Sequence, residues 1–242
     1  MSTQTLLETI KAKIEHLPKK EVSAEEEKFL KRYLGSEKKY LGTKTRDNVK
    51  IANFIIKEQQ SVTVIELIKL LNQLFASSIF EEYVVGGKIF TLLKPEVRSQ
   101  IPLSQLEKWL SQAQGWVEVD VICQSSYSGA EVLENWDEWQ EMIRKFSASD
   151  NISLRRASLV LQNPSVRKTN NANLRKLAFE TIEKLKHEKD GLITKSVSWL
   201  LRSLSDQNKA EVKEYLLKNE ATLPRIAFRE TLQKIETGKK NG

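Results

Sequence analysis

Thr63-Val64-Ile65-Glu66-Leu67-Ile68-Lys69-Leu70-Leu71-Asn72-Gln73-Leu74 carries both signals of an amphipathic helix. Thr63 and Glu66 have the spacing of a capping box, in which the hydroxyl and the carboxylate each accept a bond from an orphan amide. The apolar residues that follow recur at three-and-four spacing, which places them on one helical face. The same spacing recurs along most of the chain, and only 9 Gly and 5 Pro interrupt it. We therefore predict an all-α fold.

The ends of several helices are also marked in the sequence. Ser23 is an N-cap candidate followed by acidic Glu25–Glu27, where negative charge suits the helix dipole, and Gly35 is expected to end this helix. Ser104 and Glu107 repeat the capping-box spacing, which predicts a helix start at Ser104. Further helices are expected over residues 45–56, 79–93, 136–146, 152–161, 173–186, 192–204, 210–217 and 224–235.

Short polar loops join these helices, and two all-α architectures fit such a series. One is a compact bundle, and the other is a stack of helical pairs of the HEAT or armadillo kind, with repeats of about 40–47 residues. No clear repeat is visible in the letters. The basic charge of the chain favours stacked pairs, because such pairs form the concave surface that a long anionic ligand needs. Composition alone leaves both architectures open.

Composition and charge restrict the class of protein. The chain of 242 residues is 40% hydrophobic, which can supply a continuous core, and its formal charge is +7. A basic chain favours an anionic partner such as nucleic acid or a lipid surface, although a soluble protein can also be basic without one. No apolar run approaches the roughly 18 residues of a membrane span, and the first residues lack the pattern of a signal peptide. We expect a soluble intracellular protein.

Cysteine and histidine are scarce in the sequence. Cys123 is the only cysteine, and His16 and His187 are the only histidines. The sequence therefore excludes a disulfide framework and a structural zinc site. Ser-His or Cys-His catalysis would need one of the two histidines to fold into place. We expect neither a metal nor another cofactor.

The segment 151–179 is the most asymmetric in charge. It contains neither Asp nor Glu, and its cations are Arg155, Arg156, Arg167, Lys168, Arg175 and Lys176. Such a run is usually only a solvated face. Here Asn163-Pro164-Ser165 and Thr169-Asn170-Asn171 separate the cations, and we interpret both as loops with phosphate-binding groups. Because zinc-finger, RRM-like and Gly-rich phosphate motifs are absent, we expect contact with the backbone and shape of a nucleic acid.

Gly115-Trp116-Val117-Glu118-Val119-Asp120 sets an indole and a carboxylate four residues apart, which places both on one helical face. A tryptophan at helical spacing is usually a core residue, and this is our interpretation of Trp109, Trp136 and Trp139. A lone aspartate at position 120 would be a surface or capping carboxylate. The spacing alone leaves the role of this pair open.

Three further motifs have an order and spacing that resemble a known family. They are Asn151-Ile152-Ser153-Leu154-Arg155-Arg156-Ala157-Ser158-Leu159-Val160, Lys195-Ser196-Val197-Ser198-Trp199-Leu200-Leu201-Arg202 and Phe228-Arg229-Glu230. This series resembles the AlkD-type alkylpurine DNA glycosylases of the DNA alkylation repair family, with Trp116 and Asp120 where that family has its Trp-x-x-x-Asp pair. Tyr40-Leu41-Gly42 and Phe80-Glu81-Glu82 also look like family landmarks, so the resemblance covers roughly residues 25–236.

The resemblance implies a fold and a partner. The fold would be one HEAT-like DNA-binding domain over residues 1–242, with a helical extension over 1–22 and a flexible basic tail over 237–242. Its helical pairs would form a right-handed superhelix with a concave basic face. The partner would be double-stranded DNA that contains alkylated bases, bound by a monomer without a metal or a membrane. Such a protein is expected in the cytoplasm, associated with the nucleoid while it binds DNA.

The resemblance also implies a reaction, the excision of positively charged N3- or N7-alkylated purines without base flipping, in contrast to most glycosylases. Asp120 would be the catalytic carboxylate, with Trp116 and Trp199 as aromatic faces beside the deoxyribose. Because an alkylated purine leaves as a neutral base, the reaction needs no histidine acid. Arg156 would bind the DNA backbone. Further DNA contacts are expected from Lys195, Arg202, Arg155, Arg167, Lys168 and Arg229.

Two positions depart from the family pattern. Ser153 lies where the family often has an aromatic residue, and Gly115 lies where some members have a second tryptophan. Relatives with the same fold bind branched or unusual DNA without excising a base, because a fold does not determine an activity. A non-catalytic protein that binds damaged or branched DNA is therefore the alternative, and a helical-repeat protein scaffold is the third hypothesis.

Overall fold

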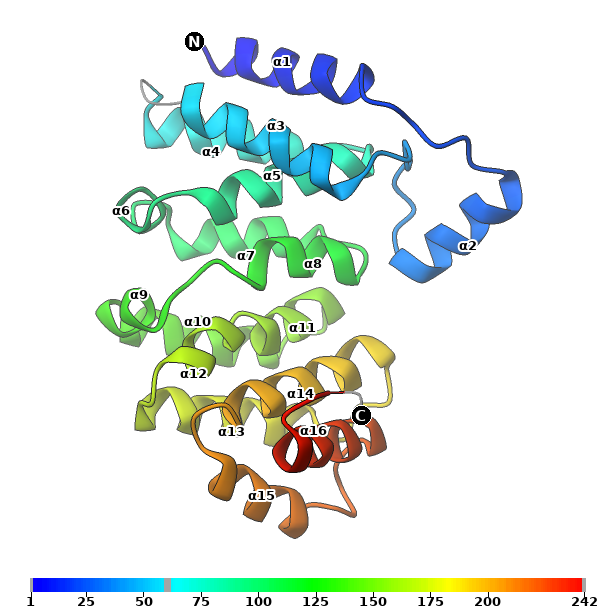
Figure 1. Ribbon diagram of the computed structural model, residues 1–242. Helices are drawn as coiled ribbons and strands as arrows, with labels where there is room; N and C mark the ends of the chain where they lie inside the picture. The colour runs from blue at the N-terminus through cyan, green and yellow to red at the C-terminus, as the bar shows by residue number, and fades with distance from the viewer. Residues whose placement is uncertain (1, 59–61, 241–242) are drawn as a thin grey trace. The chain divides into compact units, whose positions relative to one another are not determined.

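Helices make up nearly all the regular structure of this protein (Figure 1). A computed structural model describes residues 2–58 and 62–240, which fall into two compact units, Met1–Ile122 and Cys123–Gly242. Outside the helices, the described residues form one isolated bridge, between Lys39 and Ile79. The prediction of an all-α fold is confirmed.

The first unit is a stack of helices in which both consecutive and non-consecutive helices pack against each other. Helix α1 packs against α4, α3 against α5, and α4 against α5 (Figure 1). This is the contact pattern of stacked helical pairs. The helices are α1 (Thr3–Glu15), α2 (Ala24–Leu34), α3 (Thr45–Glu58), α4 (Val64–Phe75), α5 (Phe80–Leu92), α6 (Pro95–Arg98), α7 (Leu103–Ser111) and α8 (Trp116–Cys123).

The second unit repeats the same organisation. Helix α10 packs against α13 in one layer, and α11, α14 and α16 pack in series in the other. Contacts of α10 with α11 and of α13 with α14 join the two layers. The helices are α9 (Gly129–Glu134), α10 (Trp136–Ser147), α11 (Ile152–Val160), α12 (Asn163–Lys168), α13 (Ala172–Leu185), α14 (Gly191–Leu204), α15 (Lys209–Lys218) and α16 (Arg225–Thr237).

Helix caps follow the sequence signals at most positions. Ser23 and Thr63 both form complete capping boxes, and Gly35 ends α2 in the left-handed conformation with φ of 71°. The predicted start at Ser104 is wrong. Helix α7 begins at Leu103 after Pro102, which makes no side-chain cap bond, so Ser104 lies inside the first turn. Pro102 occupies the N-cap position, so Ser104 is the second helical residue and its hydroxyl does not cap the helix.

Tryptophans occupy the core of both units. Trp109 is 1% exposed, packs against Phe75 and Phe90, and donates its indole N–H to Asn72 at 2.8 Å. Trp139 is 2% exposed and packs against Tyr127. The core interpretation is confirmed for these two residues, whereas Trp136 is only half-buried at the start of α10.

The division into two units limits which of the architectural predictions are confirmed. Within each unit the HEAT-like stacking of helical pairs is confirmed. The right-handed superhelix, its concave basic face and the single domain over residues 1–242 stay predictions, as does the helical extension over 1–22. The predicted flexible tail includes residues 241–242, which lie outside the described residues. No helix in the described part of the chain is both long and apolar enough to cross a membrane.

Candidate active site

Two glycines, Gly35 and Gly115, allow the end of α2 to approach the start of α8 closely. A Cβ atom at Gly115 would lie 1.8 Å from the carbonyl oxygen of Leu34, at the end of α2. A Cβ atom at Gly35 would lie 3.3 Å from the Cα of Gly115. Any larger side chain at position 115 would push the two helix ends apart. This contact accounts for the glycine at position 115.

A buried carboxylate holds the first turn of α8. Glu118 is 0% exposed, and its Oε2 accepts a bond from the Gln114 amide at 3.1 Å and pairs with Lys38 Nζ at 3.2 Å. Its Oε1 accepts a short bond from the Ser36 hydroxyl. Lys38 in turn lies over the ring of Tyr83. The sequence did not predict this network, because its only signal is an acidic residue, Glu118, in the first turn of a helix.

Trp116 is held in one orientation by α2. Its indole N–H donates to the carbonyl oxygen of Tyr33 at 2.8 Å, and the Tyr33 ring meets the indole edge-on with centroids 5.7 Å apart. Phe29 stacks on Tyr33 at 5.9 Å, so three rings form a row from α2 to α8. Trp116 remains half-buried, which leaves part of the indole open to a ligand.

Asp120 lies one helical turn after Trp116 and is 6% exposed. Four-residue spacing on a helix places both side chains on the same face. The carboxylate needs partners in such a buried position, and Asp120 does take part in polar or electrostatic interactions. The predicted pair of one indole and one carboxylate therefore has the arrangement expected from its spacing.

Arg156 and Trp199 belong to adjacent helices of the second unit. Arg156 is 5% exposed, and its Nη1 donates to Leu192 O at 2.6 Å and to Ser196 Oγ at 2.8 Å. These bonds tie α11 to α14, and Trp199 follows Ser196 by three residues on α14, half-buried. A three-residue step keeps Trp199 on the same side of α14 as the arginine.

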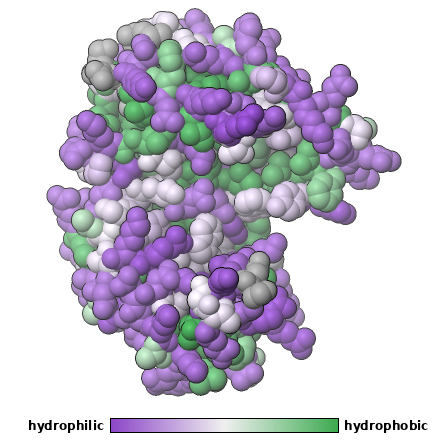
Figure 2. Space-filling model, in the orientation of Figure 1, coloured by the Kyte–Doolittle hydropathy of each residue, from purple (hydrophilic) through white to green (hydrophobic). Residues whose placement is uncertain are grey.

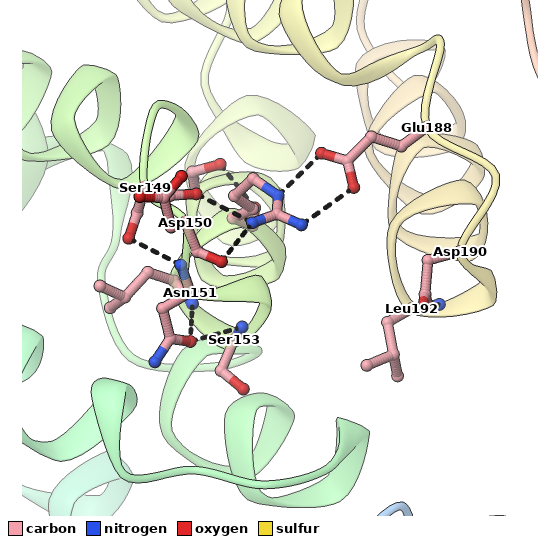
Figure 3. Close-up of polar contacts among 10 residues, drawn as sticks. Ser149, Asp150, Asn151, Ser153, Glu188, Asp190 and Leu192 are labelled. Atoms are coloured by element: carbon pink, nitrogen blue, oxygen red, sulfur yellow. Dashed lines mark hydrogen bonds and ion pairs between the residues drawn. The ribbon is translucent and has the colours of Figure 1, made fainter.

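Arg155 donates hydrogen bonds to protein groups from all three of its guanidinium nitrogens. Its Nε and Nη2 donate to the two carboxylate oxygens of Glu188 at 2.8 and 3.3 Å, and its Nη1 donates to Ser149 O and Asp150 O at 2.9 Å each. Figure 3 shows Glu188 facing this cluster from the loop before α14. A phosphate would have to displace these bonds, so the geometry supports a structural role for Arg155.

Other cations of the basic segment also meet acids from later helices. Arg167 lies 3.8 Å from Asp206, and Arg175 lies 3.0 Å from Glu211. Beyond the segment, Arg202 lies 3.6 Å from Glu230 and donates to Ser198. Burial lowers the pKa of the Arg202 guanidinium, while the Glu230 charge raises it. The segment lacks acids in sequence, but in space acids from later helices compensate much of its charge.

Three predicted DNA contacts remain open to solvent. Lys168, Lys195 and Arg229 are exposed and form no ion pair with any residue in the described ranges, 2–58 and 62–240. They come from the end of α12 and from α14 and α16. Among the predicted DNA contacts, these three side chains are therefore the ones most accessible to a phosphate.

The interpretation of Asn163-Pro164-Ser165 as a phosphate-binding loop is wrong. These residues begin α12, and both polar side chains are buried. Asn163 donates to Val160 O at 3.1 Å and accepts a bond from Ser203 at 2.7 Å, which fixes α12 against α14. Thr169-Asn170-Asn171 is a loop as predicted, and the Asn171 side chain caps α13.

Ser153 also has a structural explanation. It is 2% exposed in the first turn of α11, and its amide donates to Asn151 Oδ1 at 2.8 Å, which is the N-cap bond of this helix (Figure 3). Asp190 caps α14 in the same way through the Leu192 amide at 2.7 Å (Figure 3). The starts of the two helices that carry Arg156 and Trp199 are thus fixed by side-chain caps, which stabilise helices by about 1 kcal/mol each.

Comparisons with known proteins agree with the fold and identify the family. Among solved structures, the chain is similar to a predicted DNA alkylation repair enzyme from Enterococcus faecalis, with a TM-score of 0.70 and 20% identity, over 90% of this chain and 98% of that one. At this identity the likeness concerns the fold alone. No curated protein matches the sequence. The model of the DNA alkylation repair enzyme family matches residues 13–235, so the chain belongs to this family of DNA repair enzymes.

Proposed function

We propose that the protein is a DNA glycosylase that hydrolyses the N-glycosidic bond of positively charged N3- or N7-alkylated purines in duplex DNA, without base flipping. The observation that carries this proposal is the first turn of α8. There the indole of Trp116 is fixed by Tyr33, and Asp120 lies buried one turn later on the same face. Groups that are already held in position lower the entropic cost of reaching the reacting geometry.

The two side chains suit the charge that develops in the reaction. The alkylated base already carries a positive charge and leaves as a neutral molecule, so the charge that grows in the transition state lies on an oxocarbenium-like sugar. A carboxylate at Asp120 stabilises this sugar and orients the attacking water. An indole face adds about 0.5–2 kcal/mol of cation–π attraction. Both interactions favour the transition state over the uncharged sugar of the ground state, which is the condition for catalysis.

The second unit supplies the binding of DNA in this proposal. Trp199 provides an aromatic face, and Arg156, which its bonds to Leu192 and Ser196 fix between α11 and α14, binds the DNA backbone. Lys168, Lys195 and Arg229 contact phosphates away from the lesion. Arg202 and Arg167 contribute less because Glu230 and Asp206 already offset their charge. Binding of this kind is independent of sequence and weakens with salt.

One assay tests the proposal directly. Methylated duplex DNA is incubated with the protein, and free 7-methylguanine and 3-methyladenine are measured by chromatography. We expect release by the native protein and a loss of at least about a hundredfold in Asp120→Asn, since removal of one preorganised charge-stabilising group typically costs about 10²–10³ in rate. Duplex affinity should change little, because the substitution keeps the size of the side chain.

Asp137→Asn is the matched control for this assay. Asp137 is an exposed carboxylate in the first turn of α10, where it accepts a bond from Gln140 at 3.0 Å. It should leave both release and affinity unchanged. Release that persists in Asp120→Asn would refute the catalytic role of this carboxylate. Tight, salt-sensitive binding of branched DNA with no release by the native protein would instead favour the non-catalytic alternative.

A further inference from the structure

The first unit contains a cavity of about 660 Å³ that none of the proposed catalytic residues lines. Three segments enclose it, the α1–α2 linker, α2 and the loop before α3. Small-molecule sites typically measure about 300–1,000 Å³, so the cavity has the size of a ligand site. Figure 2 shows hydrophobic and hydrophilic side chains next to one another on the part of this unit that contains α2.

The frame of the cavity is held together by specific backbone bonds. The Lys20 amide of the linker donates to Gly42 O at 3.2 Å, and a Cβ atom at Gly42, whose φ is 79°, would lie 2.8 Å from Lys20 O. Below the loop, the buried carboxylate of Glu81 accepts bonds from the amides of Leu41 at 3.0 Å and Thr43 at 3.4 Å. The linker and the loop are thus fixed to each other and to α5.

The walls of the cavity are aromatic and apolar. Phe29 and Leu30 of α2 line one side, and Val22 and Tyr40 line the others. Phe29 is 55% exposed, and α2, described over all 11 of its residues, has no buried residue. Phe29 stacks on Tyr33 at 5.9 Å, but more than half of its surface remains exposed beside the cavity, so its ring can also stack on a planar ligand.

The charge on the cavity is positive. Lys19, Lys20 and Lys44 line it together with one carboxylate, Glu26. Lys20 pairs with Glu26 at 3.0 Å, while Lys19 and Lys44 form no ion pair among the residues that the structure describes. Like any tyrosine, Tyr40 is a hydrogen-bond donor at neutral pH; burial and the Glu81 charge raise its pKa further above the ordinary value of 10.0, and the Lys20 charge opposes them. Two unpaired cations and one hydroxyl donor suit an anion.

We propose that this cavity binds one nucleotide unit, with the base against Phe29 and Tyr40 and the phosphate at Lys19 and Lys44. A planar aromatic group joined to a phosphate is the ligand that combines both features of the lining. The nucleotide is either a free 5′-monophosphate or an unpaired nucleotide at the end of a DNA strand. The site is separate from the glycosylase chemistry, although Phe29 also begins the row of rings that ends at Trp116.

The test is a calorimetric titration of the full-length protein with deoxyadenosine 5′-monophosphate. We expect saturable binding that weakens about tenfold in Phe29→Ala, since stacking on one aromatic side chain contributes about 1–3 kcal/mol. Lys44→Gln should weaken binding by roughly threefold to fivefold, as expected for one solvent-exposed charge pair. The matched controls are Ile65→Ala and Lys57→Gln, which change an exposed apolar residue and an exposed lysine elsewhere in the unit and should leave binding unchanged.

Ligand variants separate the two halves of the proposal. Deoxyadenosine and inorganic phosphate should each bind at least about tenfold more weakly than the nucleotide that joins them, as loss of about 1.4 kcal/mol would give. Binding of the nucleotide that is unchanged in both Phe29→Ala and Lys44→Gln would overturn the proposal. So would deoxyadenosine that binds as tightly as the nucleotide. Because Phe29 and Lys44 are exposed, both variants should fold, which circular dichroism checks.

A competition experiment identifies the source of the nucleotide. Duplexes with a three-nucleotide single-stranded end and with blunt ends are compared as competitors of the bound monophosphate. Displacement by the first duplex alone would assign the site to unpaired DNA, and displacement by neither would assign it to free nucleotide. Displacement by both to the same extent would overturn the proposal, because the cavity would then not distinguish an unpaired nucleotide from a paired one.

Discussion

The two units hold their candidate functional side chains by different means. In the first unit, backbone contact at Gly115 and the buried Glu118–Lys38 ion pair fix the start of α8. In the second unit, besides the buried bonds of Arg156, partly exposed pairs such as Arg155–Glu188 and Arg167–Asp206 join helices to the loop before α14 and the turn after it. A buried contact sets geometry and is costly to break, whereas an exposed pair mainly sets charge. Substitutions that break the buried contacts of the first unit should therefore lower stability most, and removal of exposed, unpaired cations in the second unit should change affinity for an anion.

The largest stability effect is expected for Glu118→Gln. The change leaves the Lys38 ammonium, whose side chain is 8% exposed, without its carboxylate. Breaking a buried ion pair by removing one partner costs about 3–5 kcal/mol. Chemical denaturation should show this loss in the free energy of unfolding, together with reduced release of alkylpurine because Trp116 and Asp120 lie on the same helix.

A double variant distinguishes the ion pair from the general packing of Glu118. Adding Lys38→Gln to Glu118→Gln removes the unpaired charge, so the double variant should be more stable than Glu118→Gln alone. Such a recovery is the coupling that a double-mutant cycle measures for residues in contact. Strictly additive losses would show that the pair contributes no specific stabilisation.

Gly115→Ala is expected to have the next largest effect. The new methyl group would lie 1.8 Å from Leu34 O, so α2 and α8 must move apart. Overpacking of this kind costs about 1–3 kcal/mol, which corresponds to roughly 2–4 °C of melting temperature per kcal/mol for a chain of this size. Because the Tyr33–Trp116 bond spans the same two helices, release of alkylpurine should fall as well.

Gly191→Ala is the control for this substitution. A Cβ atom at Gly191 would meet nothing within 4 Å, at the first position of α14. The change should leave the melting temperature unchanged or raise it slightly, because alanine favours helix over glycine. Equal losses in the two alanine variants would contradict the idea that the approach of α2 to α8 requires glycine at position 115.

Charge substitutions in the second unit should separate exposed from paired cations. Lys195→Gln removes an exposed charge that forms no ion pair in the described ranges. Log affinity falls as log salt rises, and each lost phosphate contact should make this slope less steep by about 0.9. Arg155→Gln breaks the Glu188 bonds, so it should lower stability and leave this slope unchanged. Salt-dependent titrations of methylated duplex measure both slopes. A less steep salt dependence for Arg155→Gln than for the native protein would show that this residue contacts DNA.

These contrasts explain how far the sequence alone could lead. Local signals were reliable: Ser23 and Thr63 cap their helices, and the four-residue step from Trp116 to Asp120 gives one shared face. Such features depend on neighbours within one turn of helix. The partner of Arg155 lies 33 residues away, and the partner of Glu118 lies in the loop after α2. Long-range pairs of this kind depend on how helices stack, which the spacing of residues does not specify.

The charge of the segment 151–179 shows the same limit. Its lack of acids favoured contact with the backbone of a nucleic acid, but Glu188, Asp206 and Glu211 reach Arg155, Arg167 and Arg175 from later elements. Side chains that read as loop residues, such as Asn163, fill a buried position between helices. Charge along a sequence is thus a weaker guide to charge on a surface than helical spacing is to a helical face.

The smallest expected effect is a difference in pH dependence between two carboxylates. In the first unit, burial raises the pKa of Glu81 despite its bonds from backbone amides. In the second unit, burial also acts to raise the pKa of Glu183, but bonds from Lys186 and Tyr215 outweigh it and lower the pKa. A raised folded-state pKa means that the folded protein binds more protons than the unfolded chain, so stability from Glu81 falls as pH rises above the ordinary glutamate value of 4.5.

Glu183 should contribute with the opposite sign. Its stabilisation is present above the ordinary value of 4.5 and is lost as pH falls through the lower pKa of the folded state. Melting temperatures between about pH 3 and pH 7, a range that brackets reference carboxyl pKa values, are therefore compared for Glu81→Gln and Glu183→Gln. Relative to the native protein, the first variant should lose the fall in stability with rising pH, and the second should lose the fall with decreasing pH. Parallel curves for both variants would mean that neither carboxyl is perturbed by its surroundings, and that the contrast between a carboxylate buried under a loop and one paired on a helix surface does not extend to proton binding.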